Sequence, residues 1–311
     1  MYYRKSTNVR TYLSPLRGPL IRAAFASAEH LAPSVGAAAA ERLWFRLPAT
    51  SAHVRRSRTS LPAGTPFTAD VGGRDVRGTS WGSGDAVYLV HGWGGWGQQL
   101  EAVVPPVVDA GLKAVVFDAL SHGSSDPGRD GPSSTAVPEM VDSLRAVVAL
   151  HGPARAIVAH SLGAMATAVA LRDGLRADRV VFVSPAGSLY PTADYFGDLL
   201  GFGPRVKARL LARVERRILD RYQEPLARFD VPAIGDALSI QGRAPHLLVV
   251  HDRHDAETPY SAAVAINEAW DRSTLRTTSG LGHRRILRDR HVVDEVSEFV
   301  VTAPATSRPR R

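Results

Sequence analysis

The segment Ile157-Val-Ala-His-Ser-Leu-Gly-Ala164 places a serine directly after an apolar run and between small residues. A serine at such a strand-to-helix turn is either a helix N-cap or the nucleophile of an enzyme. A nucleophile elbow needs small neighbours so that a strained turn fits, and the pattern here is Ala159-His-Ser-Leu-Gly163, with alanine in place of the first glycine. The elbow is mechanically intact, so an acid and a base elsewhere must decide the role of Ser161.

A base for this serine is expected after a later strand. Of the eleven histidines, His283 and His291 lie downstream of the candidate acids. His283 stands on a glycine-flanked loop after an apolar run, whereas His291 begins the predicted final helix. We therefore predict that His283 is the base, against the alternative of an ordinary surface loop histidine.

Two aspartates follow the apolar run His246–His251 and compete for the acid role. Asp252 leaves the strand too early to bend back towards His283. Asp255 lies in the middle of the loop before Thr258-Pro259, a helix start. We predict that Asp255 orients the imidazole and that Asp252 and His254 make hydrogen bonds within the loop.

An acyl-transfer site also needs two N–H donors for the developing oxyanion. One is the backbone N–H of Leu162, which follows the serine. We assign the other to the backbone N–H of Trp93 in Val90-His-Gly-Trp-Gly-Gly95, at the end of an earlier apolar run. This glycine cluster lacks the Lys-Ser/Thr ending of a phosphate loop and the spacing of a dinucleotide fingerprint, which excludes both alternatives.

The elements that must position these residues alternate between strands and helices. Continuous apolar runs at 86–91, 113–118, 155–160, 179–184 and 246–251, with helical segments near 97–110, 138–150 and 162–174, indicate a doubly wound, mostly parallel sheet covered on both faces. A hairpin at 67–81 precedes them, and a strand near 275–278 and a helix near 292–301 complete the pattern. We expect an eight-stranded α/β fold.

We divide the chain into five parts. They are an N-terminal helical extension (1–64) packed on the outside of the domain, the first part of the core (65–184), an inserted helical lid (185–244), the second part of the core (245–302), and a disordered basic tail (303–311). The lid is expected because no strand pattern interrupts residues 185–244.

These motifs together resemble the α/β-hydrolase superfamily, in its lid-bearing, esterase-like branch, over residues 65–301. The motifs are His91-Gly-Trp-Gly-Gly95, Asp118-Ala-Leu-Ser-His-Gly-Ser-Ser125, Ala159-His-Ser-Leu-Gly163, Asp255 and Gly282-His283. Before the His122-Gly123 pair, the superfamily usually has proline or arginine together with glycine, whereas this sequence has Leu120-Ser121. The motif therefore does not fix the geometry of the pocket at that turn. The serine excludes the haloalkane dehalogenase and epoxide hydrolase branches, whose nucleophile is an aspartate.

Composition and charge limit the classes of molecule that this protein is expected to bind. Hydrophobic residues make up 44% and charged residues 22% of the 311, as in ordinary globular proteins, and no apolar run is long enough to span a membrane. The net charge of +8 is scattered and partly terminal, so we expect no nucleic-acid binding. There is no cysteine and no secretory pattern. We expect a cytoplasmic protein without cofactor or metal.

The lid contains an apolar stripe of Val206, Leu210, Val214 and Ile218, which we expect to cover the pocket. Its basic residues could steer anionic substrates or touch an acidic membrane, but we favour a merely solvated face. We predict pocket positions for His91, Gly92, Trp93, His160 and Tyr190. Tyr195, Phe196, Phe202 and Trp96 could also line an apolar acyl pocket, or could equally be core residues.

The sequence thus predicts a serine hydrolase that cleaves a carboxylic ester of an apolar, small-molecule acyl substrate through an acyl-enzyme. Carbon–carbon bond hydrolysis and perhydrolysis on the same triad are alternatives, as is a lipase that acts at membrane surfaces. A non-catalytic ligand-binding protein with this fold is the alternative from another class. Oligomeric state is beyond what these residues indicate.

Overall fold

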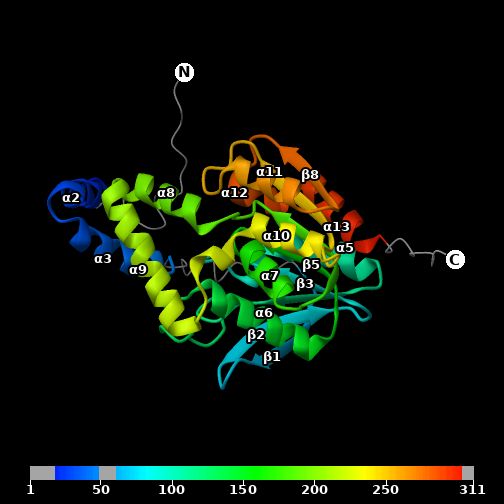
Figure 1. The fold of residues 1–311 in the computed structure, drawn as a ribbon. Coiled ribbons are helices and arrows are strands. Elements are labelled where there is room, and N and C mark those ends of the chain that lie inside the picture. The colour runs from blue at the N-terminus through cyan, green and yellow to red at the C-terminus, as the bar shows by residue number, and fades with distance from the viewer. Residues whose placement is uncertain (1–17, 49–60, 303–311) are drawn as a thin grey trace.

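The computed structural model describes residues 18–48 and 61–302, and a twisted sheet forms its centre (Figure 1). The strand order is β1-β2-β4-β3-β5-β6-β7-β8. β2 is antiparallel to both neighbours and every other pairing is parallel. The strands are β1 (Thr65–Asp70), β2 (Asp75–Trp81), β3 (Ala86–Val90), β4 (Lys113–Phe117), β5 (Ala154–His160), β6 (Ala177–Val183), β7 (His246–Asp252) and β8 (Ser273–Thr278). The predicted doubly wound, mostly parallel, eight-stranded sheet is confirmed.

Both faces of the sheet are buried, which is why its central strands are apolar throughout. Along β3, Tyr88 and Val90 belong to the core formed with α6 (Val137–His151) and α7 (Leu162–Arg172). Val87 and Leu89, on alternate positions, belong to the core formed with α5 (Val104–Asp109) and α13 (Arg290–Val301). The period of two along the strand therefore separates two helical layers.

The helix predicted over residues 97–110 is shorter and divided. A 3₁₀ helix, η1 (Gly97–Val103), is followed by α5, which has proline in its first turn. Proline has no N–H and fits only the first turn of a helix, so Pro105 and Pro106 separate the two segments.

Four helices form a separate layer at one end of the molecule, which we call the helical cap (Figure 1). They are α2 (Gly18–Leu31), α3 (Pro33–Trp44), α8 (Leu189–Leu200) and α9 (Pro204–Tyr222). α3 packs along α9, and α2 contacts α3, α8 and α9. The N-terminal helices, predicted to lie on the outside of the domain, thus form the cap together with part of the insertion.

The remainder of the insertion belongs to the core layer. η2 (Leu226–Phe229) leads into α10 (Val231–Ile240), which packs against α7 and α11 (Tyr260–Ala269). Residues 185–244 therefore contain two different parts, and only the first belongs to the helical cap. None of the described helices is long and apolar enough to cross a membrane. The predicted disordered tail, 303–311, lies outside the described residues.

The junction of α2 with α9 depends on a buried carboxylate. Glu29 of α2 is 8% exposed, and its oxygens accept the backbone N–H groups of Gly203, Arg205 and Val206 at 3.0, 2.8 and 3.0 Å. Burial alone would raise the pKa of Glu29, but these three donors at the helix N-terminus outweigh it, and the pKa is lowered. Glu29 therefore supplies the N-terminal capping group that α9 lacks in its own sequence.

Candidate active site

Ser161 occupies a tight turn between β5 and α7, with φ 54° and ψ −122°. Two glycines make room for it. A Cβ on Gly163 would lie 2.4 Å from the carbonyl oxygen of His91, and a Cβ on Gly92 would lie 2.8 Å from Cβ of Ser161. The turn forms with alanine at position 159, which is fully buried in β5. The backbone thus holds the hydroxyl at the carboxyl end of the sheet, where an exposed nucleophile is expected.

The structure brings the predicted serine, histidine and acid together. The distance from Ser161 Oγ to His283 Nε2 is 3.0 Å, and from His283 Nδ1 to Asp255 Oδ2 it is 2.8 Å. With Nδ1 protonated, the imidazole donates to Asp255 while Nε2 accepts the serine hydroxyl. His283 and the Asp255 side chain are buried. This chain of hydrogen bonds can carry a proton away from the serine.

Asp255 is held in its ionised state by donors that surround it. Its Oδ1 accepts the backbone N–H groups of Glu257 and Thr258 at 2.8 and 3.0 Å, and its Oδ2 accepts the Thr258 hydroxyl at 3.0 Å. Burial would raise the pKa of Asp255, but the hydrogen bond and charge of His283, with these backbone donors, hold it well below the ordinary value. Asp255 can therefore fix the imidazole and stabilise the imidazolium without taking the proton.

Asp252 makes hydrogen bonds within the loops, as expected, and its partners belong to the segment that leads to His283. It is fully buried, and it accepts the backbone N–H groups of Leu281 at 2.8 Å and Gly280 at 3.2 Å and the hydroxyl of Thr278 at 2.8 Å. His254 donates its backbone N–H to the same carboxylate. Asp252 therefore ties the end of β8 to the end of β7, just ahead of His283.

The two predicted oxyanion donors lie at the pocket beside the serine. Trp93 and Leu162 both line it together with Ser161. The loop that carries Trp93 is braced by His122, whose Nε2 accepts the backbone N–H of Gly94 at 3.2 Å. Burial, with the nearby His91, lowers the pKa of His122 to about 3. A neutral imidazole is therefore available as the acceptor.

His91, Gly92 and His160 do not line the pocket, in contrast to the prediction, because they lie beneath its floor. His91 is buried, its Nε2 accepts the backbone N–H of Ala119 at 3.0 Å, and burial lowers its pKa. His160 lies behind the base, with Nε2 3.0 Å from the carbonyl oxygen of His283. Gly92 leaves room for the turn at Ser161, His160 contacts the backbone of His283, and His91 holds the loop at Ala119.

Tyr190 was also predicted to line the pocket, and it points elsewhere. It is 46% exposed on the first turn of α8. The residues of α8 that line the pocket recur at helical spacing on another face: Leu189, Thr192, Tyr195, Phe196 and Leu199. The helical period therefore turns Tyr190 towards solvent and its neighbours inward.

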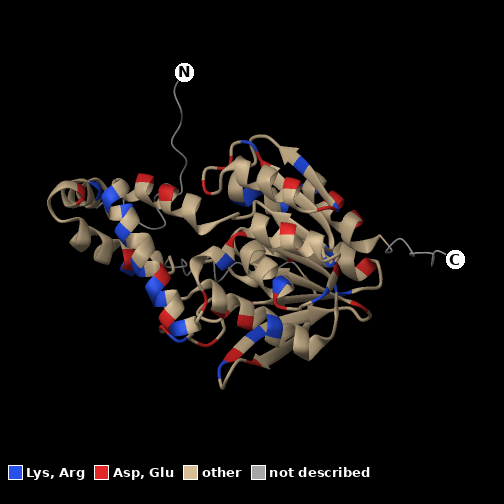
Figure 2. Ribbon diagram, viewed as in Figure 1, with Lys and Arg blue, Asp and Glu red and all other residues tan. Residues whose placement is uncertain are grey.

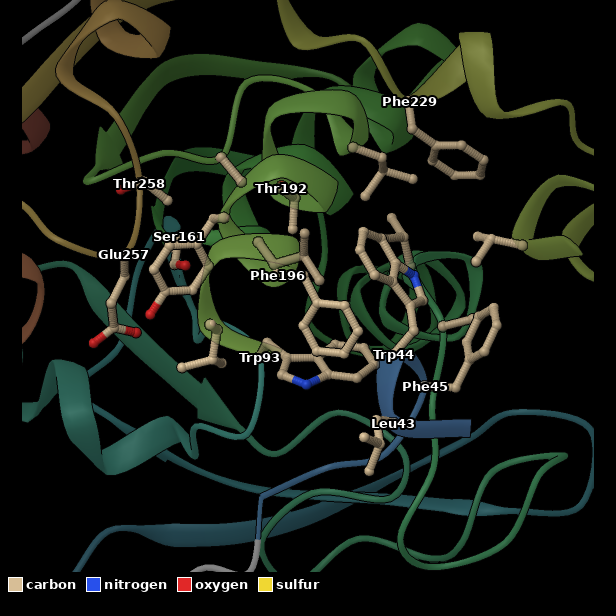
Figure 3. A pocket seen from close by; sticks show the side chains of 18 of the residues that line it. Leu43, Trp44, Phe45, Trp93, Ser161, Thr192, Phe196, Phe229, Glu257 and Thr258 are labelled. Carbon is tan, nitrogen blue, oxygen red and sulfur yellow. The ribbon is translucent and has the colours of Figure 1, made fainter. Parts of the chain in front are cut away.

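The pocket lies between the helical cap and the sheet, with a volume of about 150 Å³. Trp93 and Phe196 lie across its middle, and Trp44, Phe45 and Phe229 lie further from Ser161 (Figure 3). Trp96 and Phe202 are not among its lining residues. The sequence prediction missed Leu43, Trp44 and Phe45, although three consecutive apolar residues at the end of a helix were a usable signal. It also missed Glu257 and Arg284.

The apolar stripe of α9 only partly faces this pocket. Val214 and Ile218 line it, whereas Val206 and Leu210 are buried elsewhere. Val206 packs towards α3, where a Cβ on Gly36 would lie 3.0 Å from it. The stripe therefore joins the cap helices to one another as well as covering the pocket.

A merely solvated face was expected for the basic residues along α9 (Figure 2), and it holds only in part, because three of its arginines form ion pairs. Arg213 pairs with Glu41 of α3 at 2.6 Å, and Arg217 pairs with Asp130 of the core at 2.6 Å. Arg221 also pairs with Asp130, and Arg217 lies 4.3 Å from the ring centroid of Phe45. These cations connect α9 to α3 and to the sheet domain.

No group of three or more His, Asp or Glu side chains within the described ranges is arranged to hold a metal ion. The chemistry that the arrangement supports is nucleophilic acyl transfer, with a serine activated by a buried histidine–carboxylate pair.

Comparison with known proteins places this geometry in a family. One curated relative, the non-heme chloroperoxidase CPO-A1 of Kitasatospora aureofaciens, is 31% identical over 102 residues, 32% of this chain and 35% of that protein. The chain thus matches about a third of that relative's length.

Solved structures share the fold at low identity. A meta-cleavage product hydrolase of Pseudomonas fluorescens IP01 is 20% identical with a TM-score of 0.54, covering 76% of this chain and 96% of that one. An esterase of Exiguobacterium antarcticum is 15% identical with a TM-score of 0.55, covering 77% and 100%. The family model of the alpha/beta hydrolase family matches residues 87–298. The chain, a hydrolase by this match, therefore belongs to the alpha/beta hydrolase family.

Proposed function

We propose that this hydrolase cleaves carboxylic esters of small acyl groups through a covalent acyl-enzyme. The observation that carries the proposal is the continuous hydrogen-bonded chain from Ser161 through His283 to Asp255, at 3.0 and 2.8 Å. A protein that only bound ligands would have no physical need for this register of hydroxyl, imidazole and carboxylate.

The proposed reaction follows from these positions. Ser161 Oγ attacks the ester carbonyl while His283 Nε2 takes its proton, and Asp255 stabilises the imidazolium. The backbone N–H groups of Trp93 and Leu162 bind the oxyanion. The proton then passes to the alcohol oxygen, the alcohol leaves, and water activated by the same imidazole releases the acid.

The pocket supports a short or compact acyl group. Its volume of about 150 Å³ is that of an apolar cavity able to hold a molecule the size of benzene. Aromatic and aliphatic side chains at the end distant from Ser161 favour an apolar chain there. We expect acyl groups of up to about six carbons to react best, given that size.

The test is covalent labelling together with a substrate series. Intact-mass analysis after treatment with a fluorophosphonate should show one adduct on the wild type and none on Ser161→Ala. A p-nitrophenyl ester series of increasing acyl length should be hydrolysed with a maximum at short chains. Ligand binding without an adduct or turnover would refute the proposal and favour the non-catalytic alternative.

Perhydrolysis is a second candidate, favoured by the chloroperoxidase relative. In that reaction hydrogen peroxide instead of water attacks the same acyl-enzyme and releases a peracid. Product analysis with acetate esters in the presence of peroxide separates the two activities. Peracid formation that outpaces acetate release at millimolar peroxide would favour perhydrolysis.

A further inference from the structure

A carboxylate and a guanidinium lie at the reactive end of a mostly apolar pocket. Glu257 and Arg284 both line it, and Glu257 lies at the same end as Ser161 and Thr258 (Figure 3). The Glu257 side chain is 18% exposed, and its backbone N–H donates to Asp255 at 2.8 Å. The loop that positions the catalytic acid therefore also fixes this second carboxylate.

The geometry places Glu257 beside the leaving group of the proposed reaction. Glu257 Oε2 is 3.8 Å from His283 Nε2, and its Oε1 is 3.4 Å from Nε of Arg284. When the imidazole protonates the departing alcohol, the alcohol oxygen must lie about 3 Å from Nε2. The next atoms of the alcohol are then adjacent to the carboxylate.

Such a neighbour discriminates between alcohols. A carboxylate only accepts hydrogen bonds, and covering it with an apolar chain removes water without replacing its donors, which is costly. A hydroxyl on the second carbon from the ester oxygen replaces the lost water, and a hydrogen bond to a charged group is among the stronger ones. At the opposite end the lining side chains Trp44, Phe45 and Phe229 are uncharged.

We propose that Glu257, supported by Arg284, forms a leaving-group subsite selective for esters whose alcohol carries a hydrogen-bond donor on the second carbon from the ester oxygen. The inference rests on the proposed ester hydrolysis. In the selected step the bond from Ser161 Oγ to the acyl carbon forms and the carbon–oxygen bond to the alcohol breaks. The serine proton passes through His283 to the released alcohol, whose second hydroxyl donates to Glu257.

The experiment compares three butanoate esters that leave the same acyl-enzyme. 2-Hydroxyethyl butanoate has a donor, propyl butanoate has the same number of heavy atoms without it, and 2-methoxyethyl butanoate keeps the inductive effect but cannot donate. Because kcat/KM covers steps up to acylation, its ratio between esters is independent of hydrolysis of the shared intermediate. We expect the wild type to prefer the hydroxyethyl ester over both others by about tenfold or more.

Variants at Glu257 test the assignment. Glu257→Gln should reduce this preference severalfold, and Glu257→Met should abolish it, because the first loses the charge and the second the acceptors. Glu268→Gln, which changes an exposed carboxylate on α11, is the matched control and should keep the wild-type ratio. Fluorophosphonate labelling of each variant verifies that the triad is assembled. If Glu257→Met does not label, the ester preference of Glu257→Gln alone tests the subsite.

The possible results distinguish failure of the Glu257 subsite from failure of the proposed ester hydrolysis. Equal kcat/KM for the three esters in the wild type, or an unchanged ratio in Glu257→Gln and Glu257→Met, would overturn the subsite while leaving ester hydrolysis intact. No hydrolysis of any ester, with no labelling of Ser161, would instead overturn the proposed function.

Discussion

The hydrogen-bond partners of its ring nitrogens distinguish the candidate base from the other buried histidines. Burial lowers the pKa of four of them, which therefore act as neutral hydrogen-bonding groups within the fold: His91, His122, His160 and His251. Among the buried histidines of the described ranges, His283 is the one that contacts a hydroxyl at one ring nitrogen and a carboxylate at the other while facing the pocket. That pairing is what proton transfer requires.

We expect His283→Ala to lower kcat by about a thousandfold or more, since within residues 18–48 and 61–302 His283 is the group hydrogen-bonded to Ser161 Oγ that can accept its proton. His291→Ala should be close to wild type, because His291 is exposed on α13. Steady-state hydrolysis of p-nitrophenyl butanoate measures both. Equal losses in the two variants would mean that the base has been assigned wrongly.

Trp44 limits the far end of the pocket, where its ring meets that of Phe196 edge-on at 5.4 Å between centroids. Trp44→Leu should shift the preferred acyl length towards longer chains, because a smaller side chain leaves additional space. The p-nitrophenyl series measures the shift. Tyr190→Leu, at the exposed position on α8, is the control, and an unchanged optimum in Trp44→Leu would place the acyl chain elsewhere.

The triad could be predicted from sequence because the carboxyl ends of neighbouring parallel strands meet at one edge, whatever the remaining structure. Ser161, Asp255 and His283 each follow such a strand. The pocket could not, because its lining depends on how α3 packs along α9 and on the rotation of α8. Tyr190 and Trp44 show this: the period of α8 and the apolar run at 43–45 are local signals, but which face of each helix meets the pocket is set by how the cap helices pack.

At the scale of elements, Glu29 connects two helices that are far apart in sequence. Its carboxylate accepts three N–H groups at the start of α9. Glu29→Ala should lower the free energy of unfolding by about 1–2 kcal/mol at neutral pH, as loss of a helix cap does. Because the folded-state pKa of Glu29 is lowered, this contribution is present above the unfolded pKa and is lost as pH falls through the folded value.

Urea unfolding of the wild type and Glu29→Ala at several pH values measures that contribution. The difference between them should be constant above about pH 5, given an ordinary Glu pKa of about 4.3, and should shrink progressively in more acidic solution. Glu268→Ala is the control for loss of an exposed carboxylate. A difference that grew on acidification would contradict the capping role.

At the scale of the whole molecule, the helical cap over the pocket is built from two segments that are distant in sequence. α2–α3 precede the sheet domain, and α8–α9 are inserted between β6 and β7. Their attachment to the core includes Asp130, whose side chain is 6% exposed and pairs with Arg217 and Arg221. This connection gives Arg217 and Arg221 a role: they hold one wall of an apolar cavity to the core. The charge pattern seen in the sequence was real, but its partners come from distant parts of the chain.

Asp130→Asn should loosen the cap, because it removes the carboxylate that pairs with both Arg217 and Arg221. The loss in free energy of unfolding should fall between the ~1 kcal/mol of exposed ion pairs and the ~3–5 kcal/mol of buried ones. The acyl-length profile should broaden towards longer esters as the cap separates more readily from the core. Asp194→Asn, which removes an ion pair between α8 and α9 inside the cap, is the matched control and should leave the profile unchanged.

Salt provides an independent check of the same connection. Partly exposed pairs weaken as ionic strength rises, so the wild-type profile at about 1 M salt should approach that of Asp130→Asn, whose profile should itself respond little. If instead the variant and the wild type hydrolyse long esters equally at low salt, the ion pairs stabilise the fold without controlling the pocket. Substrate length would then be set by the aromatic side chains alone, and Trp44→Leu would be the variant that changes it.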